Sequence, residues 1–188
     1  MKTHMIGWSL LVALGTSIAV STADEPQQGQ MPQPTKEHEW LKKLEGEWAI
    51  QGECTDPNGA TKQIKGSESN ELLGGFWSIG RVEAEGDQPM KGIFTLGFDD
   101  EKKKYVATWV DSTHGTLWRY EGQLDSGGKV LTLEGEGRCP IEGMIKVKEI
   151  IEVQGPDKRT FTSQREKDGQ WRTMLSLSYT RKSPENPQ

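Results

Sequence analysis

Four side chains near the middle of the chain have the types and spacing of a binding site. Trp109 and Asp111 are separated by one position, and so are Trp118 and Tyr120. Because alternate residues of a β-strand point to the same face, each pair shares one face of its strand. Aromatic rings with a few polar groups are typical of the wall of a ligand cavity. We therefore predict that these four residues bind a ligand. The alternative for Asp111 is that it lies at the end of its strand and its carboxylate caps the turn toward Gly115.

His114 follows this segment and could ligate haem or act as a general base oriented by Asp111. It lies in the turn signal His114-Gly115, however, which favours a polar residue at a hairpin tip. We predict no haem, no other cofactor and no metal site. His38, which falls in a predicted helix, is expected to be solvated.

The Gly-x-Ser-x-Gly motif of an enzymatic serine nucleophile is absent from the chain. The carboxylate pairs Glu134 with Glu136 and Glu149 with Glu152 could suggest general acid and base catalysis. Carboxylates on solvated strand faces are ordinary, so we interpret both pairs as surface residues. The sequence therefore assigns no catalytic residue.

The composition favours a single antiparallel β domain. Hydrophobic residues make up 32% of the 188 residues, and the mean hydropathy is −0.72, as expected when apolar and polar positions alternate along strands. The net charge is −5, and the lysines and arginines are scattered. No basic stripe is available to neutralise phosphates, so nucleic acid is excluded as a partner.

Residues 1–23 have the pattern of a secretory signal peptide. Lys2 precedes an apolar run from Met5 to Val20, and the small residues Ser21 and Ala23 come next. A membrane anchor is the alternative, but the run is shorter than the roughly 20 apolar residues of a spanning helix. We predict cleavage after Ala23 and a soluble periplasmic or extracellular protein with no membrane insertion of the mature chain.

Cys54 and Cys139 are the only cysteines. In an oxidising compartment they are expected to form a disulfide, and two separate buried thiols are the alternative. They do not form a metal site, because no further cysteine or nearby histidine completes a tetrahedral ligand set.

The rest of the chain predicts a β-barrel. Residues 24–34 are expected to be a flexible lead-in, 35–182 the barrel domain, and 183–188 a disordered tail. A short helix of about two turns begins at Thr35 and ends before Gly46. From Glu47 the pattern has a period of two, with turn signals about every ten residues. About ten hairpin-linked strands close most simply as an up-and-down antiparallel barrel, for which the helix is a plug.

Gly46-Glu47-Trp48 on the first predicted strand and Arg181 on the last resemble the closing feature of calycin (lipocalin-like) barrels, where an arginine packs over the tryptophan. The resemblance implies that Trp48 and Arg181 close one end of the barrel, with Lys182 as the alternative basic residue. The predicted helix should cover the same end. A ligand would then reach the interior from the other end, around Thr113-His114-Gly115.

The chain also resembles, over roughly residues 36–182, a bacterial family known as domain of unknown function 1579. The resemblance rests on the order of several stretches: His38-Glu39-Trp40-Leu41, Leu44-Glu45-Gly46-Glu47-Trp48, Lys65-Gly66-Ser67-Glu68-Ser69-Asn70, Leu73-Gly74-Gly75, Leu96-Gly97-Phe98-Asp99, Lys103-Lys104-Tyr105-Val106-Ala107-Thr108-Trp109-Val110-Asp111, Leu131-Thr132-Leu133-Glu134-Gly135-Glu136 and Tyr179-Thr180-Arg181-Lys182. It implies a calycin-like barrel and no catalytic assignment.

The sequence thus favours an exported, non-enzymatic barrel whose partner is a small apolar or amphipathic ligand. An enzyme acting on a small lipid-like or phenolic compound, with Asp111 and His114 at the barrel mouth, is the first alternative. Convergence of those two residues and an arginine on one cavity would favour it. A structural or interaction domain with a solid core is the second alternative, and the cavity volume distinguishes it. The sequence does not indicate an oligomeric state.

Overall fold

The computed structural model describes residues 31–56, 58–86, 88–139 and 142–183. The predicted signal peptide lies outside the described residues, as do most of the predicted lead-in and nearly all of the predicted tail. From residue 33 onward the chain forms one unit. Among the described residues, no helix has the length and apolar character needed to cross a membrane.

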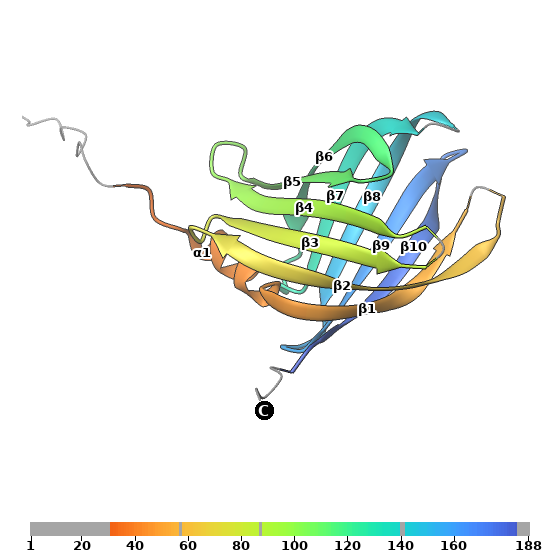
Figure 1. Cartoon of the computed structure of the whole chain (residues 1–188). Coiled ribbons are helices and arrows are strands. Elements are labelled where there is room, and N and C mark those ends of the chain that lie inside the picture. Colours follow the sequence, from red (N-terminus) through yellow and green to blue (C-terminus); the bar gives the residue numbers. More distant parts are fainter. Residues whose placement is uncertain (1–30, 57, 87, 140–141, 184–188) are drawn as a thin grey trace, which may run out of the picture. The chain divides into compact units, whose positions relative to one another are not determined.

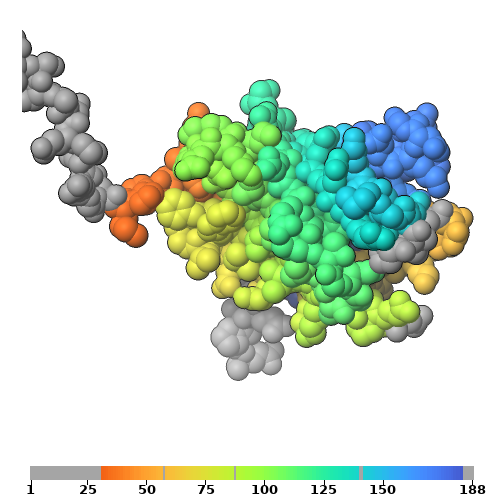
Figure 2. All heavy atoms as spheres, turned by 90° about the horizontal axis from the view of Figure 1, so that it is seen from above, coloured from red at the N-terminus to blue at the C-terminus, as the bar shows by residue number. Residues whose placement is uncertain are grey.

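Ten antiparallel strands form a closed barrel in which each strand pairs with its neighbours in the sequence and the last pairs with the first (Figure 1). This confirms the predicted all-β, up-and-down architecture. The strands are β1 (Gly46–Thr55), β2 (Thr61–Leu73), β3 (Trp77–Glu85), β4 (Met90–Asp99), β5 (Lys104–Asp111), β6 (His114–Leu124), β7 (Val130–Cys139), β8 (Gly143–Val153), β9 (Lys158–Lys167) and β10 (Gln170–Arg181). Seen from above, the side chains of successive strands cover the outer surface broadly in chain order (Figure 2).

Alternation along each strand separates the interior from the outer surface. In β8, for example, Val147, Glu149 and Ile151 are buried, whereas Lys148 and Ile150 between them are only partly buried. The same period of two runs through β9, where Arg159, Ser163 and Arg165 are buried. The interior therefore contains charged residues as well as an apolar core.

A short helical segment closes one end of the barrel. It consists of α1 (Lys36–Glu39) and the 3-10 turn η1 (Trp40–Lys43), which together replace the predicted two-turn helix. The indole of Trp40 donates a hydrogen bond to the carbonyl of Gly128 (3.1 Å), and the hydroxyl of Tyr105 donates one to the carbonyl of Glu37 (2.8 Å). Both bonds fix the segment at the end where odd-numbered strands begin, as predicted for a plug.

Gly46 ends the helical segment with a φ of +114°, in the region that side chains rarely adopt. A Cβ atom at this position would also lie 2.4 Å from Nη1 of Arg181. Glycine is therefore required here both by the backbone conformation and by the close approach of the guanidinium group.

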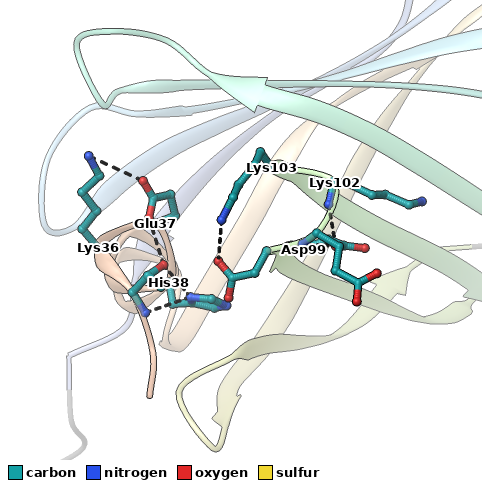
Figure 3. A network of polar contacts seen from close by, with 9 residues as sticks. Lys36, Glu37, His38, Asp99, Lys102 and Lys103 are labelled. Carbon is teal, nitrogen blue, oxygen red and sulfur yellow. Dashed lines mark hydrogen bonds and ion pairs between the residues drawn. The ribbon is translucent and has the colours of Figure 1, made fainter. Parts of the chain in front are cut away.

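The prediction that His38 is solvated is wrong, because its side chain is only 2% exposed. Its ring makes edge contacts with the rings of Phe76 (5.1 Å between centroids) and Phe98 (5.8 Å). The Nδ1 atom accepts a hydrogen bond from the backbone N–H of Thr35 (3.0 Å). Figure 3 shows this helix beside the β4–β5 turn, where Asp99 accepts a backbone hydrogen bond from Lys102 (2.9 Å). His38 thus stabilises the packing of the helical segment against the barrel.

Candidate ligand-binding cavity

The barrel encloses a cavity of about 470 Å³ that opens at the end opposite the helix. Its rim includes residues at the ends of odd-numbered strands, among them Cys54, Asp111 and Cys139. It also includes Met90 and His114, which begin even-numbered strands. Because the strands are antiparallel, all five residues lie at one end of the barrel, and the helical segment before β1 lies at the other.

The wall of the cavity is largely apolar. The ring of Phe94 lies 6.4 Å from the ring of Tyr120 and 6.4 Å from that of Phe161, which joins β4, β6 and β9 across the interior. Side chains from six strands contribute to the wall: Phe94, Trp109, Trp118, Ile145, Phe161 and Leu177. All four residues predicted to bind a ligand, Trp109, Asp111, Trp118 and Tyr120, line this cavity.

Two glycines make room for the indoles near the mouth. Trp109 and Trp118 are paired in the β5–β6 register. A Cβ atom at Gly92 in β4 would lie 2.1 Å from the Trp109 ring, and one at Gly137 in β7 would lie 2.2 Å from the Trp118 ring. The two indoles therefore lie over the neighbouring strands on opposite sides of the hairpin.

Asp111 connects the cavity wall to the hairpin turn. Its Oδ2 accepts a hydrogen bond from the indole of Trp109 (3.0 Å), and its Oδ1 accepts bonds from the backbone N–H of Thr113 (2.8 Å) and His114 (3.0 Å). Partial burial acts to raise the pKa of Asp111, but the bonds from Thr113 and Trp109 outweigh it and lower the pKa below its usual value. The carboxylate caps the turn, which was the alternative interpretation of this residue, and also orients an indole of the cavity.

His114 lies at the hairpin, as its turn signal predicts, and its side chain is half exposed. Its Nδ1 is 3.4 Å from Oδ1 of Asp111 and 2.8 Å from the hydroxyl of Thr113. Arg138, near the end of β7, lines the same cavity. Asp111, His114 and an arginine thus converge on one cavity, although both carboxylate oxygens of Asp111 already accept hydrogen bonds.

A buried ion pair lies deeper in the barrel. Nη2 of Arg159 donates to Oε1 of Glu68 at 2.7 Å, and the side chains are 5% and 6% exposed. The guanidinium carbon of Arg159 lies 4.1 Å from the ring centroid of Tyr179 and 4.7 Å from that of Trp48. Asn70 donates a further hydrogen bond to Oε1 of Glu68 (2.8 Å). The charges of this pair are therefore compensated within the protein.

Glu149 is a second buried carboxyl group on the cavity wall. Its Oε1 accepts a hydrogen bond from the hydroxyl of Ser163 (3.0 Å), and its Oε2 is buried without a hydrogen-bond partner among the described residues. Burial raises the pKa of Glu149 to about 8, because the bond from Ser163 only partly offsets the loss of solvation. The expectation that Glu149 is a surface carboxylate is therefore wrong.

Two tyrosine hydroxyls share this region. Burial raises the pKa of both Tyr120 and Tyr179, and the charge of Glu149 contributes in each case. Within the described part of the chain, neither hydroxyl has a hydrogen-bond partner, and both residues line the cavity. They are thus protonated groups that remain free to bind a ligand.

The far end is closed by Trp48 and Arg181, the pair implied by the calycin resemblance. They are directly paired in the β1–β10 register, and the guanidinium carbon lies 4.2 Å from the centroid of the fully buried indole. Trp48 also donates to the carbonyl of Leu44 (2.8 Å). Lys182 instead continues the backbone pairing with Glu47 (2.8 Å).

The predicted disulfide between Cys54 and Cys139 is not formed, because both residues are free thiols. Both line the cavity near its mouth, but β1 and β7 are separated in the sheet by β8, β9 and β10. Neighbouring strands lie about 4.8 Å apart, and a disulfide joins Cα atoms less than about 7 Å apart. Two strands with three others between them are therefore too far apart around the sheet for this bond.

Sequence reasoning missed Glu68, Arg159 and Glu149 as interior residues. The signal that could have found them is the strand alternation itself. Glu149 has the same parity as Val147 and Ile151. Sequence alone favours a solvated position for a charged residue, because charged side chains are seldom fully buried unless they are paired.

Comparisons with known proteins identify the fold. No curated protein matches the chain. The crystal structure of Rv2717c from M. tuberculosis is similar with a TM-score of 0.62 and 15% identity, covering 80% of this chain and 100% of that one. The S-type phycobiliprotein lyase CPES from Guillardia theta is similar with a TM-score of 0.55 and 13% identity, covering 81% and 100%.

Likeness at these identities establishes the shared barrel fold alone. Within the described ranges, no group of three or more histidine, cysteine or acidic side chains is arranged to hold a metal ion. The match to a family model spans residues 33–181 and includes every strand of the barrel. The chain therefore belongs to the family described as protein of unknown function (DUF1579).

Proposed function

We propose that this protein is a non-enzymatic binding protein that takes up a small amphipathic molecule in its barrel. The observation that carries the proposal is the cavity of about 470 Å³, which is open at one end and has an apolar wall. Small-molecule sites are typically concave, with volumes of about 300–1,000 Å³ and a few polar groups among apolar ones. The size also weighs against a solid-core structural domain.

The polar groups of the cavity support an amphipathic rather than a purely apolar ligand. Glu149, Tyr120 and Tyr179 lie on the wall among aromatic and aliphatic side chains. An apolar ligand would leave these groups without partners, which costs about 1–3 kcal/mol for each buried polar group. A ligand with an apolar body and a polar end satisfies both parts of the wall.

Binding is tested with a pair of variants that add the same indole inside and outside the barrel. Val82 in β3 lines the cavity, and its neighbour Glu83 is exposed on the outer face. The probe is 2-acetylnaphthalene, followed through quenching of tryptophan fluorescence. Val82→Trp should weaken its binding at least tenfold by filling the cavity, and Glu83→Trp should leave it unchanged. Equal binding by both variants would place the probe elsewhere and contradict the proposal.

An enzyme is the second candidate, favoured by the position of His114 beside Asp111 (3.4 Å) with Arg138 on the same cavity. A carboxylate can orient a histidine that acts as a general base. The test is hydrolysis of short-chain naphthyl and phenyl esters by the wild type and by His114→Ala. Turnover that falls at least a hundredfold in the variant would support an enzyme, and turnover that is equal in both proteins would contradict it.

Export is part of the proposal and rests on the sequence of residues 1–23, with its charged start, apolar run and small residues before Asp24. Fractionation of cells that express the full chain, followed by N-terminal sequencing, tests it. A mature chain that begins at Asp24 in the periplasm or medium is the expected result. An uncleaved cytoplasmic chain would contradict export without affecting the binding proposal.

A further inference from the structure

We propose that Glu149 selects ligands that carry an uncharged hydrogen-bond acceptor, such as a carbonyl or ether oxygen, at the end buried in the cavity. The inference rests on the proposed binding function and names the chemical class of its ligand. It begins from a carboxyl oxygen that has no partner within the described residues, Oε2 of Glu149.

The side chain of Glu149 forms part of the cavity wall. It lies in β8 between Val147 and Ile151, and all three side chains line the cavity. In the sheet it is paired with Leu133 of β7 on one side and with Ser163 of β9 on the other. The residue is only 5% exposed. A ligand in the cavity therefore meets this group in an environment from which water is largely excluded.

The hydrogen bond from Ser163 determines which oxygen carries the proton. The hydroxyl of Ser163 donates to Oε1 (3.0 Å), so Oε1 serves as an acceptor. With a pKa of about 8, the carboxyl group is mostly neutral at pH 7. Its proton then resides on Oε2, which becomes a donor without an acceptor. A buried donor in this state costs about 1–3 kcal/mol until a ligand supplies an acceptor.

Charged groups around Glu149 disfavour an anionic ligand. Arg159 is paired with Glu68 (2.7 Å), and Arg165 of β9 is paired with Glu142 before β8. β7 presents Leu133, which is uncharged. In this deep part of the cavity an anionic ligand end would therefore be buried beside arginines that are already paired, which is costly in a low-dielectric interior. The remaining arginine of the wall, Arg138, lies near the mouth.

Two further groups support an acceptor on the ligand. The hydroxyls of Tyr120 in β6 and Tyr179 in β10 lie close enough to Glu149 for its charge to raise their pKa values. Both hydroxyls are protonated at neutral pH and can donate hydrogen bonds. Asp111 is ionised at the mouth, but its oxygens accept bonds from Trp109, Thr113 and His114. The deep part of the cavity is thus rich in uncharged donors.

A cationic ligand is the main competing class, because it could bind an ionised Glu149. Burying an ion pair removes solvation from both charges, and the attraction often fails to exceed that cost. A neutral acceptor avoids it, since Glu149 remains protonated. The two classes are separated by experiment.

The test uses four naphthalene probes of the same size with different ends: 2-acetylnaphthalene, 2-ethylnaphthalene, 2-naphthoate and 2-naphthylmethylammonium. Binding is followed at pH 7 through tryptophan fluorescence. The ketone should bind about tenfold more tightly than the ethyl compound and more tightly than either charged probe. The cation binding most tightly would overturn the proposal, and so would equal affinities for the ketone and the ethyl compound.

Variants at position 149 test the role of the residue itself. Glu149→Leu should abolish the tenfold preference for the ketone, whereas Glu149→Gln should restore it, because the amide keeps a donor toward the cavity and an acceptor for Ser163. Above pH 8 the wild type should lose ketone affinity as Glu149 ionises, and Glu149→Gln should not. The matched control is Glu152→Leu, which removes a carboxylate from the outer face of β8. Its preference should equal that of the wild type.

Circular dichroism of each variant verifies that the barrel is folded. A preference retained in Glu149→Leu would assign selection to another residue and overturn the inference. If the ethyl compound binds and the ketone is not preferred, only the inference fails. If none of the four probes binds, the proposed binding function fails with it.

Discussion

Arg159 and Glu68 form an ion pair inside the barrel, with 2.7 Å between Nη2 and Oε1, although their strands are not neighbours in the sheet. β9 and β2 are separated by β10 and β1, so the pair lies over residues of those two strands, including Tyr179 and Trp48. The contact links opposite sides of the β1–β10 pairing. It therefore supports closure of the barrel from within.

Loss of one partner of this pair should be strongly destabilising. Glu68→Gln leaves the Arg159 charge buried without compensation, and we expect a loss of about 3–5 kcal/mol in the free energy of unfolding. Urea denaturation at pH 7 measures it. The matched control is Glu71→Gln, which neutralises an exposed carboxylate in the same strand and should change stability by less than about 1 kcal/mol.

Replacing both partners should cost less than replacing one. In the double variant with Glu68→Leu and Arg159→Met no charge is left buried, and substitution of buried ion pairs by apolar residues is often neutral. We expect the double variant to be more stable than Glu68→Gln alone. A double variant that is less stable than the single one would show that the cation contacts of Arg159 with Trp48 and Tyr179 outweigh its desolvation.

Truncation of Trp48 should empty a large site at the closed end. Trp48→Ala removes a fully buried indole that contacts two guanidinium groups, and we expect a loss of about 3–5 kcal/mol by denaturant unfolding. Lys182→Ala, next to Arg181, is the control and should have little effect. Comparable losses in both variants would contradict the assignment of closure to the indole.

Glu149 should make stability fall as the pH rises. Its pKa is about 8 in the folded protein and about 4.3 in an unfolded chain, so between these values the unfolded state releases a proton that the folded state retains. The free energy of unfolding should fall by up to about 1.4 kcal/mol per pH unit from this group. Glu149→Gln removes the effect, so it should be more stable than the wild type at pH 7.5 and nearly equal at pH 4. A difference that does not change with pH would contradict the raised pKa.

A methyl group at Gly92 should displace the indole of Trp109, because the new Cβ would lie 2.1 Å from the ring. We expect Gly92→Ala to shift tryptophan fluorescence and to weaken binding of 2-acetylnaphthalene severalfold. Gly97→Ala is a close control, since its Cβ would lie 2.4 Å from the ring of Trp77 on the outer face. It should move an exposed indole without changing the affinity. Equal effects on affinity would indicate a general distortion of β4.

The redox state of the two cysteines at the mouth of the cavity can be tested chemically. Alkylation of the unreduced, denatured protein, measured by mass spectrometry, should modify both Cys54 and Cys139. A mass showing that neither cysteine is alkylated would instead indicate a disulfide.

Much of the architecture could be predicted because it depends on local patterns. Alternation and regularly spaced turn residues predict ten strands, and the stop at Gly46 predicts the end of the helical segment. The interior charges could not be predicted in the same way. Glu68 and Arg159 are 91 positions apart in the sequence, and their pairing depends on closure of the sheet. The burial of Glu149 likewise requires knowing that its face of β8 is turned toward the cavity.

The placement of His38 illustrates the same limit at short range. Its helical position is consistent with solvent exposure, but the short helix sits against two aromatic rings from the barrel, Phe76 and Phe98. Tertiary contacts of this kind override the local preference. The cavity residues Trp109 and Trp118 are more accessible to prediction, because each shares a strand face with a second site residue two positions along the sequence.

The seam between β1 and β10 has a consequence for how the chain folds. Arg181 contacts the carbonyl of Glu45, 136 positions earlier in the sequence. β1 can pair with β2 early, but its other edge remains unpaired until β10 is in place. The incomplete sheet therefore has two unpaired edges until nearly the whole domain has folded. Contacts of such long separation slow folding, and unpaired edges attract other chains. The interval before the seam forms is thus the period in which the folding protein is most vulnerable to aggregation.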